Sequence, residues 1–262
     1  MTSLADRTIA ALRTNHDDLA ALVPTLSADQ LTGASGASEW SVAQVLSHLG
    51  SGAEIALAGY QAAFAGTPAP EQDFNQRVWG RWNALTPREQ AADFLAHDAE
   101  LVAALEALTS DQRETLQVKL GFLPSPLPLA AVAGMRLNES TLHGWDVRVA
   151  LDPGAALEED TAVLLADHLA GDLSFLLGFS GKADVLSEPT VVEVQGSPFG
   201  LTIDDRVTAT AAVRDATATF TGPLEAVLRL IAGRLAPDRT PDAVEVTGNV
   251  TLDDLRRVFP GY

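Results

Sequence analysis

Apolar residues recur at helical spacing through the first part of the chain. Between residues 3 and about 25 the apolar residues lie at helical spacing, and Asp, Arg and His occur among them. The apolar positions are Leu4, Ile9, Leu12, Leu19, Leu22 and Val23. This period predicts an amphipathic helix. The Ser- and Gly-rich stretch over 27–38 that follows predicts an irregular connection.

Three more long helices are predicted before residue 152. Two of them begin at capping boxes, in which a Ser or Thr and a Gln or Glu three residues later bond to free backbone N–H groups: Ser41 with Gln44, and Thr86 with Glu89. A fourth helix runs from about Leu129 to Leu151 and stops at Asp152-Pro153-Gly154. Four such helices predict a four-helix bundle, a fold whose core can collect metal ligands from facing helices.

The pattern changes after residue 180. Short runs rich in Val, Thr and Ala alternate with turn residues over 190–195, 199–203, 207–213, 216–220 and 244–247. They predict an antiparallel sheet, joined by helices from about 224 to 233 and from 252 to 258. A further helix is expected over 160–177. The fold class is therefore α+β with two domains, 1–155 and 156–262, and the boundary falls between 153 and 185.

Composition and charge narrow the class of partner. The formal net charge is -18, which argues against nucleic acid and against anionic membrane surfaces, because both are bound through clustered Lys and Arg. Arg far outnumbers Lys, which occurs only at Lys119 and Lys182, as is typical of high-GC genomes.

The chain contains no cysteine, so disulfides, thiolate metal ligands and a Cys nucleophile are excluded. Any sulfur chemistry must use a small-molecule thiol. No apolar run approaches the roughly 18 residues of a membrane span, and the N-terminus lacks the basic and apolar regions of a signal peptide. We therefore expect a soluble cytoplasmic protein.

Candidate chemistry lies on two of the predicted helices. Glu139 and His143 are four residues apart on the helix that ends near 151, so they share one face. His48 lies on the helix that follows Ser41. Taken alone, each feature has a plainer interpretation: His48 as a core residue, and the Glu–His pair as a solvated one. However, the pair lies on an apolar stripe, where an unpaired carboxylate is costly, and this favours a two-His, one-carboxylate metal site.

Four other titratable residues are expected to lie outside the set of metal ligands. Asp146, three residues after His143, is either a partner for that imidazole or a helix-terminal residue. His97 and Asp98 are expected to face solvent, and His168 to be structural or exposed.

Two motifs resemble a known family. They are Trp40-Ser-Val-Ala-Gln-Val-Leu-Ser-His48-Leu49 and Glu139-x-x-x-His143-x-Trp145-Asp146, and they are similar to the mycothiol-dependent maleylpyruvate isomerase family of the DinB/YfiT-like metalloenzymes. The resemblance covers nearly the whole chain. It implies a DinB-like bundle with the metal triad, followed by a smaller domain similar to sterol carrier proteins.

The resemblance also implies the site and the activity. His48, Glu139 and His143 would bind a divalent ion, zinc in the first place, although the same ligand set suits non-haem iron. Arg234 would help to hold the substrate, with Arg229 as the alternative. Mycothiol would be the thiol cosubstrate, in an actinobacterial enzyme that is either a maleylpyruvate-type cis-trans isomerase or an S-transferase acting on a small electrophile.

The sequence also allows a second function. The alternative function is a non-catalytic small-molecule or lipid-binding protein with a structural metal. A large apolar cavity in the C-terminal domain, with no polar groups converging on it, would favour that alternative. We expect a monomer or a homodimer.

Overall fold

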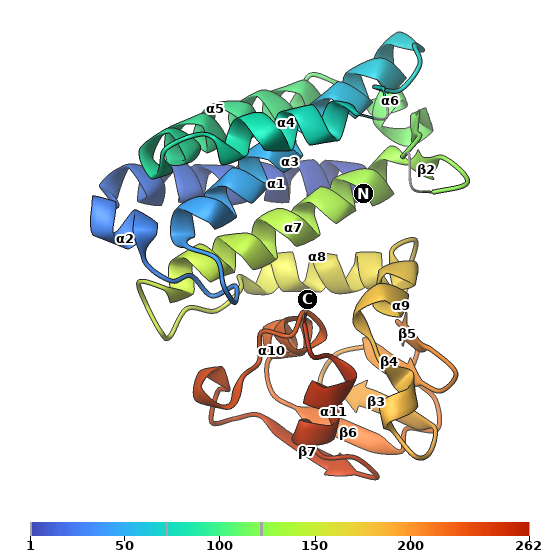
Figure 1. Cartoon of the computed structure of the whole chain (residues 1–262). Helices are drawn as coiled ribbons and strands as arrows, with labels where there is room; N and C mark the ends of the chain where they lie inside the picture. The colour runs from blue at the N-terminus through green and yellow to red at the C-terminus, as the bar shows by residue number, and fades with distance from the viewer. Residues whose placement is uncertain (1, 72, 121–122, 262) are drawn as a thin grey trace. The chain divides into compact units, whose positions relative to one another are not determined.

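The computed structural model describes residues 2–71, 73–120 and 123–261 (Figure 1). They group into two compact units, Met1–Pro153 and Gly154–Tyr262. The assignment of domains 1–155 and 156–262 stays a prediction, because compactness alone does not show that each part folds independently.

Unit 1 is a helix bundle. Its long helices α1 (Leu4–Leu22), α3 (Val42–Ala65), α5 (Pro87–Glu106) and α7 (Leu129–Val149) pack along one another, and the shorter α4 (Phe74–Asn83) packs on α3 (Figure 1). One apolar cluster fills the space around α3; its members include Val45, Leu46, Leu49, Trp82, Phe94 and Val147. The predicted bundle is therefore confirmed.

Local sequence signals explain where the long helices begin. Ser41 with Gln44, and Thr86 with Glu89, form the two predicted capping boxes. The prediction for 27–38 is wrong in part, since this stretch contains the short helix α2 (Ala28–Thr32), which has a capping box of its own. Further short elements were not predicted: η1 (Val23–Thr25), α6 (Ser110–Thr115), β1 (Gln117–Val118) and β2 (Leu127–Pro128).

Unit 2 is built on a sheet with strand order β5-β4-β3-β6-β7. The strands are β3 (Thr190–Val194), β4 (Gly200–Ile203), β5 (Val207–Thr210), β6 (Ala218–Thr221) and β7 (Glu245–Gly248). The pairs β3–β4, β4–β5 and β6–β7 are antiparallel, as expected, whereas β3 and β6 pair in parallel. The two-part α+β fold class is confirmed, with a sheet that is mixed at its centre.

The helices of unit 2 follow the predicted positions with one correction. The long ones are α8 (Glu159–Ala170), α10 (Leu224–Ile231) and α11 (Leu252–Val258). The helix expected over 160–177 ends at Ala170, because Gly171 leaves the helical conformation, and the chain continues through η2 (Ser174–Leu176) and α9 (Leu177–Ser180). η3 (Ala183–Val185) and η4 (Pro237–Arg239) complete the unit.

Within the described ranges, no single helix is long and apolar enough to cross a membrane. One sharply bent pair, α8 with the segment Ser174–Ser180, passes the same test by length and composition only.

Candidate metal centre

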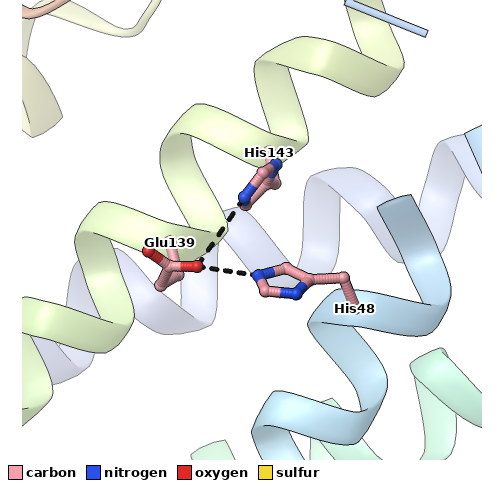
Figure 2. A group of neighbouring side chains, drawn as sticks. All are labelled: His48, Glu139 and His143. Carbon is pink, nitrogen blue, oxygen red and sulfur yellow. Dashed lines mark hydrogen bonds and ion pairs between the residues drawn. The ribbon is translucent and has the colours of Figure 1, made fainter. Parts of the chain in front are cut away.

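Helices α3 and α7 bring the three predicted ligands together (Figure 2). His48 lies in the second turn of α3, and Glu139 and His143 occupy successive turns of α7. Nε2 of His48 lies 2.9 Å from Oε2 of Glu139, and Nε2 of His143 lies 3.7 Å from the same oxygen. One potential ligand atom from each residue falls within 4.8 Å of the other two. Residues separated by 91 positions in the sequence thus converge on one point.

The chemistry of these donors fits a divalent ion. Two imidazole nitrogens and one carboxylate form the ligand set of open catalytic zinc sites, and the set also suits non-haem iron. In His143 the second ring nitrogen is already engaged, since Nδ1 lies 2.8 Å from Oδ2 of Asp146. Nε2 is therefore the nitrogen that this ring directs toward the shared point.

Asp146 is the residue that orients His143. Its side chain is 0 % exposed, and its backbone carbonyl accepts a hydrogen bond of 2.8 Å from the N–H of Gly36. A carboxylate behind a ligating imidazole fixes the tautomer and the ring orientation and raises the basicity of the free nitrogen. Of the two roles considered from the sequence, the structure supports that of imidazole partner.

Glu139 is ionised at neutral pH. Burial of the carboxylate raises its pKa, but the hydrogen bond with His48 and the electrostatic interactions with His143, His48 and Arg136 outweigh that effect and lower the pKa to about 2. Even so, 46 % of the side-chain surface remains exposed. The site therefore presents an anionic ligand that solutes can reach.

Trp40 forms an aromatic wall at the site, a role that the sequence did not reveal. Its ring centroid lies 5.1 Å from that of His48 and 5.9 Å from that of His143, and the planes of Trp40 and His143 are within 23° of parallel. The side chain is 37 % exposed. From the sequence, Trp40 was only the first residue of the motif that contains His48, because a ring over two imidazoles depends on the packing of α3 and α7.

The two candidate arginines of unit 2 differ in their surroundings. Arg229 is buried and binds Glu225 through two hydrogen bonds of 2.7 and 2.9 Å, and its Nη1 donates to the carbonyl of Arg239. These contacts indicate a structural role. Arg234 is half-buried and donates from Nη1 to the carbonyl of Ala232 at 3.0 Å. Its role in holding substrate stays a prediction.

The prediction that Asp98 faces solvent is wrong. Asp98 is buried on α5, where its two oxygens bind His16 at 2.9 Å and Arg136 at 2.7 Å. Its neighbour His97 is partly exposed. His168 is buried on α8, which agrees with the structural role considered for it.

Unit 2 contains a cavity of about 530 Å³ that includes none of the three candidate ligands. Apolar residues such as Leu157, Val163 and Phe199 line part of it, and the acidic residues Glu159, Asp167 and Glu225 also belong to the lining. The cavity is therefore not the purely apolar one that would have favoured a lipid-binding function.

Known proteins resemble this chain in sequence and in fold. Two proteins of Mycobacterium tuberculosis, both described as uncharacterized, match about half of it: Rv0036c is 30% identical over 55% of this chain and 56% of its own length, and Rv0738 is 29% identical over 56% of this chain and 69% of its own length. The chain thus spans little more than half of the first of these relatives.

Solved structures of a mycothiol-dependent maleylpyruvate isomerase and of a mutant of it cover 100% of both chains with a TM-score of 0.67, at 16% sequence identity. That likeness establishes a shared fold. The family model for the mycothiol maleylpyruvate isomerase N-terminal domain matches residues 12–148, a range that includes His48, Glu139 and His143. On this match the chain belongs to the mycothiol maleylpyruvate isomerase family.

Proposed function

We propose that this protein is a divalent-metal enzyme in which a low-molecular-weight thiol, mycothiol in the first place, attacks a small electrophile. The observation that carries the proposal is the convergence of His48, Glu139 and His143 within 4.8 Å, with Asp146 bound behind His143. Family membership supports the choice of thiol.

Each residue has a distinct task in this proposal. His48 and His143 would hold the metal through Nε2 and Glu139 through its carboxylate, while Asp146 keeps the ring of His143 in place. A bound divalent ion would supply a Lewis acid that lowers the pKa of a thiol and so favours the nucleophilic thiolate. Trp40 covers one side of the site and offers an aromatic face to an apolar part of a ligand.

Two net reactions follow from one nucleophilic step. When the thiolate adds to the double bond of a cis-enoyl acid, a C–S bond forms, the π bond breaks, and its electron pair moves onto the conjugated carbonyl as an enolate. The former double bond is then a single bond that can rotate. Elimination of the thiolate then breaks the C–S bond and leaves the trans isomer. With an epoxide or an activated leaving group, the thioether is the product and the net reaction is S-transfer. Arg234 would bind a substrate carboxylate, for which its planar fork is suited.

The second candidate is a small-molecule or lipid-binding protein with a structural metal. The cavity in unit 2 offers a small molecule a place to bind, but its acidic lining residues do not suit a purely apolar ligand. Two features favour the enzyme instead. Structural zinc sites normally have four protein ligands, whereas three ligands leave a position open. In addition, the ligating carboxylate remains accessible, with 46 % of its side chain exposed.

The test is the metal content per chain of protein purified without added metal or chelator. We expect about one equivalent in the wild type, and none in His48→Ala or His143→Ala. His97→Ala is the matched control, because His97 is a partly exposed histidine of the same bundle outside the triad. Circular dichroism of each variant establishes that loss of metal is not loss of fold.

The outcome decides between the two functions. Metal that is lost with either histidine, together with thiol-dependent turnover of an electrophile, would establish the enzyme. A wild-type protein that takes up no metal even when zinc is offered would overturn the proposal. If the protein binds metal and an apolar ligand, and His48→Ala lowers stability while the ligand still binds, the binding-protein alternative is correct.

A further inference from the structure

Arg136 lies next to the candidate ligands. It precedes Glu139 by three residues and His143 by seven on α7, so the three side chains share a face of the helix. Its Nη1 would lie only 3.3 Å from a Cβ at Gly52, one turn after His48 on α3. The guanidinium is therefore placed between the two helices that carry the triad, beside the triad itself.

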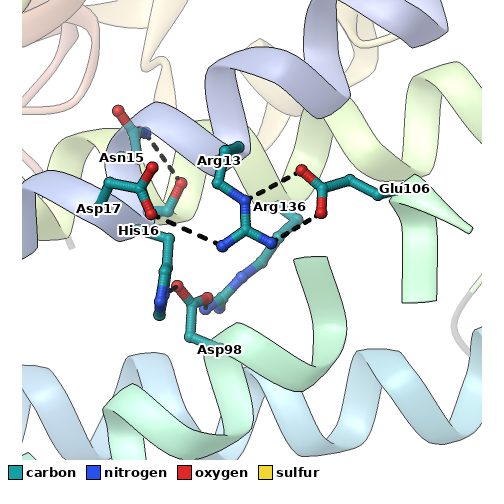
Figure 3. Close-up of polar contacts among 8 residues, drawn as sticks. Arg13, Asn15, His16, Asp17, Asp98, Glu106 and Arg136 are labelled. Carbon is teal, nitrogen blue, oxygen red and sulfur yellow. Dashed lines mark hydrogen bonds and ion pairs between the residues drawn. The ribbon is translucent and has the colours of Figure 1, made fainter. Parts of the chain in front are cut away.

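Asp98 and His16 fix the position of Arg136 (Figure 3). Nη2 of Arg136 donates to Oδ1 of Asp98 at 2.7 Å, and Oδ2 of Asp98 lies 2.9 Å from Nδ1 of His16. Only 5 % of the Arg136 side chain is exposed. Burial opposes ionisation of Asp98, but Arg136 and His16 outweigh it and hold its pKa below the usual value. An ionised, buried carboxylate thus keeps the guanidinium from turning toward bulk water.

The guanidinium retains unused hydrogen-bonding capacity. Among the residues that the structure describes, Nε of Arg136 is buried without a hydrogen-bond partner, and so is the hydroxyl of Tyr60. A buried donor without a partner is costly, and each such group in a folded protein calls for an explanation. In the described part of the chain, Nε of Arg113 is also without a hydrogen-bond partner, but Arg136 differs from Arg113 in lying beside the candidate ligands.

The positive charge of Arg136 acts in opposite directions on a divalent cation and on an anionic ligand bound at the triad. It attracts the carboxylate of Glu139. By Coulomb's law it repels a divalent cation and attracts any anion that enters the site. The guanidinium of Arg136 thus opposes the binding of a metal ion at the triad. It favours a negatively charged ligand that binds beside the metal.

We propose that Arg136, oriented by Asp98 and His16, makes the triad site selective for anionic ligands such as carboxylates and thiolates. The inference rests on the proposed function, because it concerns the ligand that binds beside the metal. Arg136 acts as a specificity-determining residue through its charge, and the side chains that hold it come from α1 and α5, outside the triad.

The experiment uses the full chain loaded with Co²⁺, whose visible spectrum reports both occupancy and a change of ligand. Azide serves as the anionic probe and imidazole as the neutral one. We expect Arg136→Gln to weaken azide binding by about tenfold or more, because at an effective dielectric of about 20 one unit charge within about 12 Å contributes at least that much. Imidazole binding should not change, and Co²⁺ should bind at least as tightly. Arg136→Lys, which keeps the charge, should restore most of the affinity for azide.

Two controls separate this role from a structural one. Arg13 is a partly exposed arginine on α1 that forms an ion pair with Glu106 on α5 (Figure 3). The variant Arg13→Gln should bind both probes like the wild type. Arg136→Gln leaves Asp98 with His16 as its partner, and the remaining carboxylate would itself repel azide. The double variant with Asp98→Asn removes both charges, and it should show a smaller loss of azide that is still selective over imidazole.

Three results would overturn the inference. Unchanged azide affinity in Arg136→Gln, with Co²⁺ bound, would show that the charge does not act on the site. An equal loss of azide and imidazole would indicate a role in structure alone. A wild-type protein that takes up no Co²⁺ at all would remove the proposed function, and with it the basis of the inference; the first two results leave that function intact.

Discussion

Two glycines of α3 should respond in opposite ways to the same substitution. A Cβ at Gly50 would lie 2.1 and 2.5 Å from two ring carbons of Trp82, whereas a Cβ at Gly59 would meet nothing within 4 Å. Both glycines lie inside a helix of 24 residues. Replacement by Ala therefore changes helix propensity equally at both positions, and only the packing differs.

The magnitudes follow from that contrast. Ala is favoured over Gly in a helix interior by about 1 kcal/mol, so Gly59→Ala should stabilise the protein by roughly that amount. At Gly50 the new methyl would overlap the indole far inside the normal contact distance of about 3.5–4.0 Å. Trp82 cannot retreat easily, because it is fully buried and its Nε1 donates to Glu54 at 2.9 Å. Overpacking of this kind costs about 1–3 kcal/mol. We expect the upper end, and a net loss of about 2 kcal/mol.

Thermal unfolding followed by far-UV circular dichroism measures the difference. With about 2–4 °C per kcal/mol for a domain of this size, Gly59→Ala should raise Tm by a few degrees and Gly50→Ala should lower it by about 4–8 °C. Each variant is the control for the other, since both remove one glycine from the unfolded chain. If Gly50→Ala proves as stable as Gly59→Ala, the packing of Trp82 against α3 is not rigid and the reasoning fails.

Two more predictions concern buried carboxylates of the bundle. Asp146→Asn should weaken zinc binding about 10–100-fold in a calorimetric titration, because His143 loses the charged partner of its Nδ1; undiminished affinity would show that Asp146 does not orient the ligand. The pKa of Asp98 is lowered in the folded state, so its stabilisation is complete above the unfolded value of about 3.9 and is lost as the pH falls through the folded value. Urea unfolding should therefore show Asp98→Asn to be less stable than the wild type at neutral pH. Below about pH 4 the variant should lose less stability than the wild type. Equal losses in the two proteins would show that ionised Asp98 does not stabilise the fold.

The helix bundle could be predicted because its signals are local. A capping box needs residues only three positions apart, and an amphipathic stripe needs a few turns. The same logic explains the missed helix α2, because Ser27 and Gln30 form a capping box like that of Ser41 and Gln44 but lie in a stretch rich in Ser and Gly, which indicated a loop. The parallel pairing of β3 with β6 could not be predicted, because the alternation of residues within a strand shows which face is buried and not which strand lies beside it.

Buried polar residues were harder to predict than apolar ones. His16 and Asp98 are polar and have polar neighbours, Asp17 and His97, so each fits the solvated face of its helix. Their burial depends on each other and on Arg136, which is 38 positions from Asp98. A charge is tolerated in a core only when its partners are already in place, and three partners on three helices leave no periodic signal.

The candidate site shows the same division between local and distant information. Glu139 and His143 could be paired from spacing alone, His48 was a candidate from its place on a second predicted helix, and the family motif contained all three, so the ligand residues followed from short stretches of sequence. The charge around those atoms does not follow from any short stretch, because it depends on how Asp98 and His16 hold Arg136. If the inference about Arg136 is correct, substitutions at His16 or Asp98 will change which ligand binds beside the metal while all three metal ligands stay the same. The preference for a ligand is then a property of the bundle core, and the triad motif alone does not predict it.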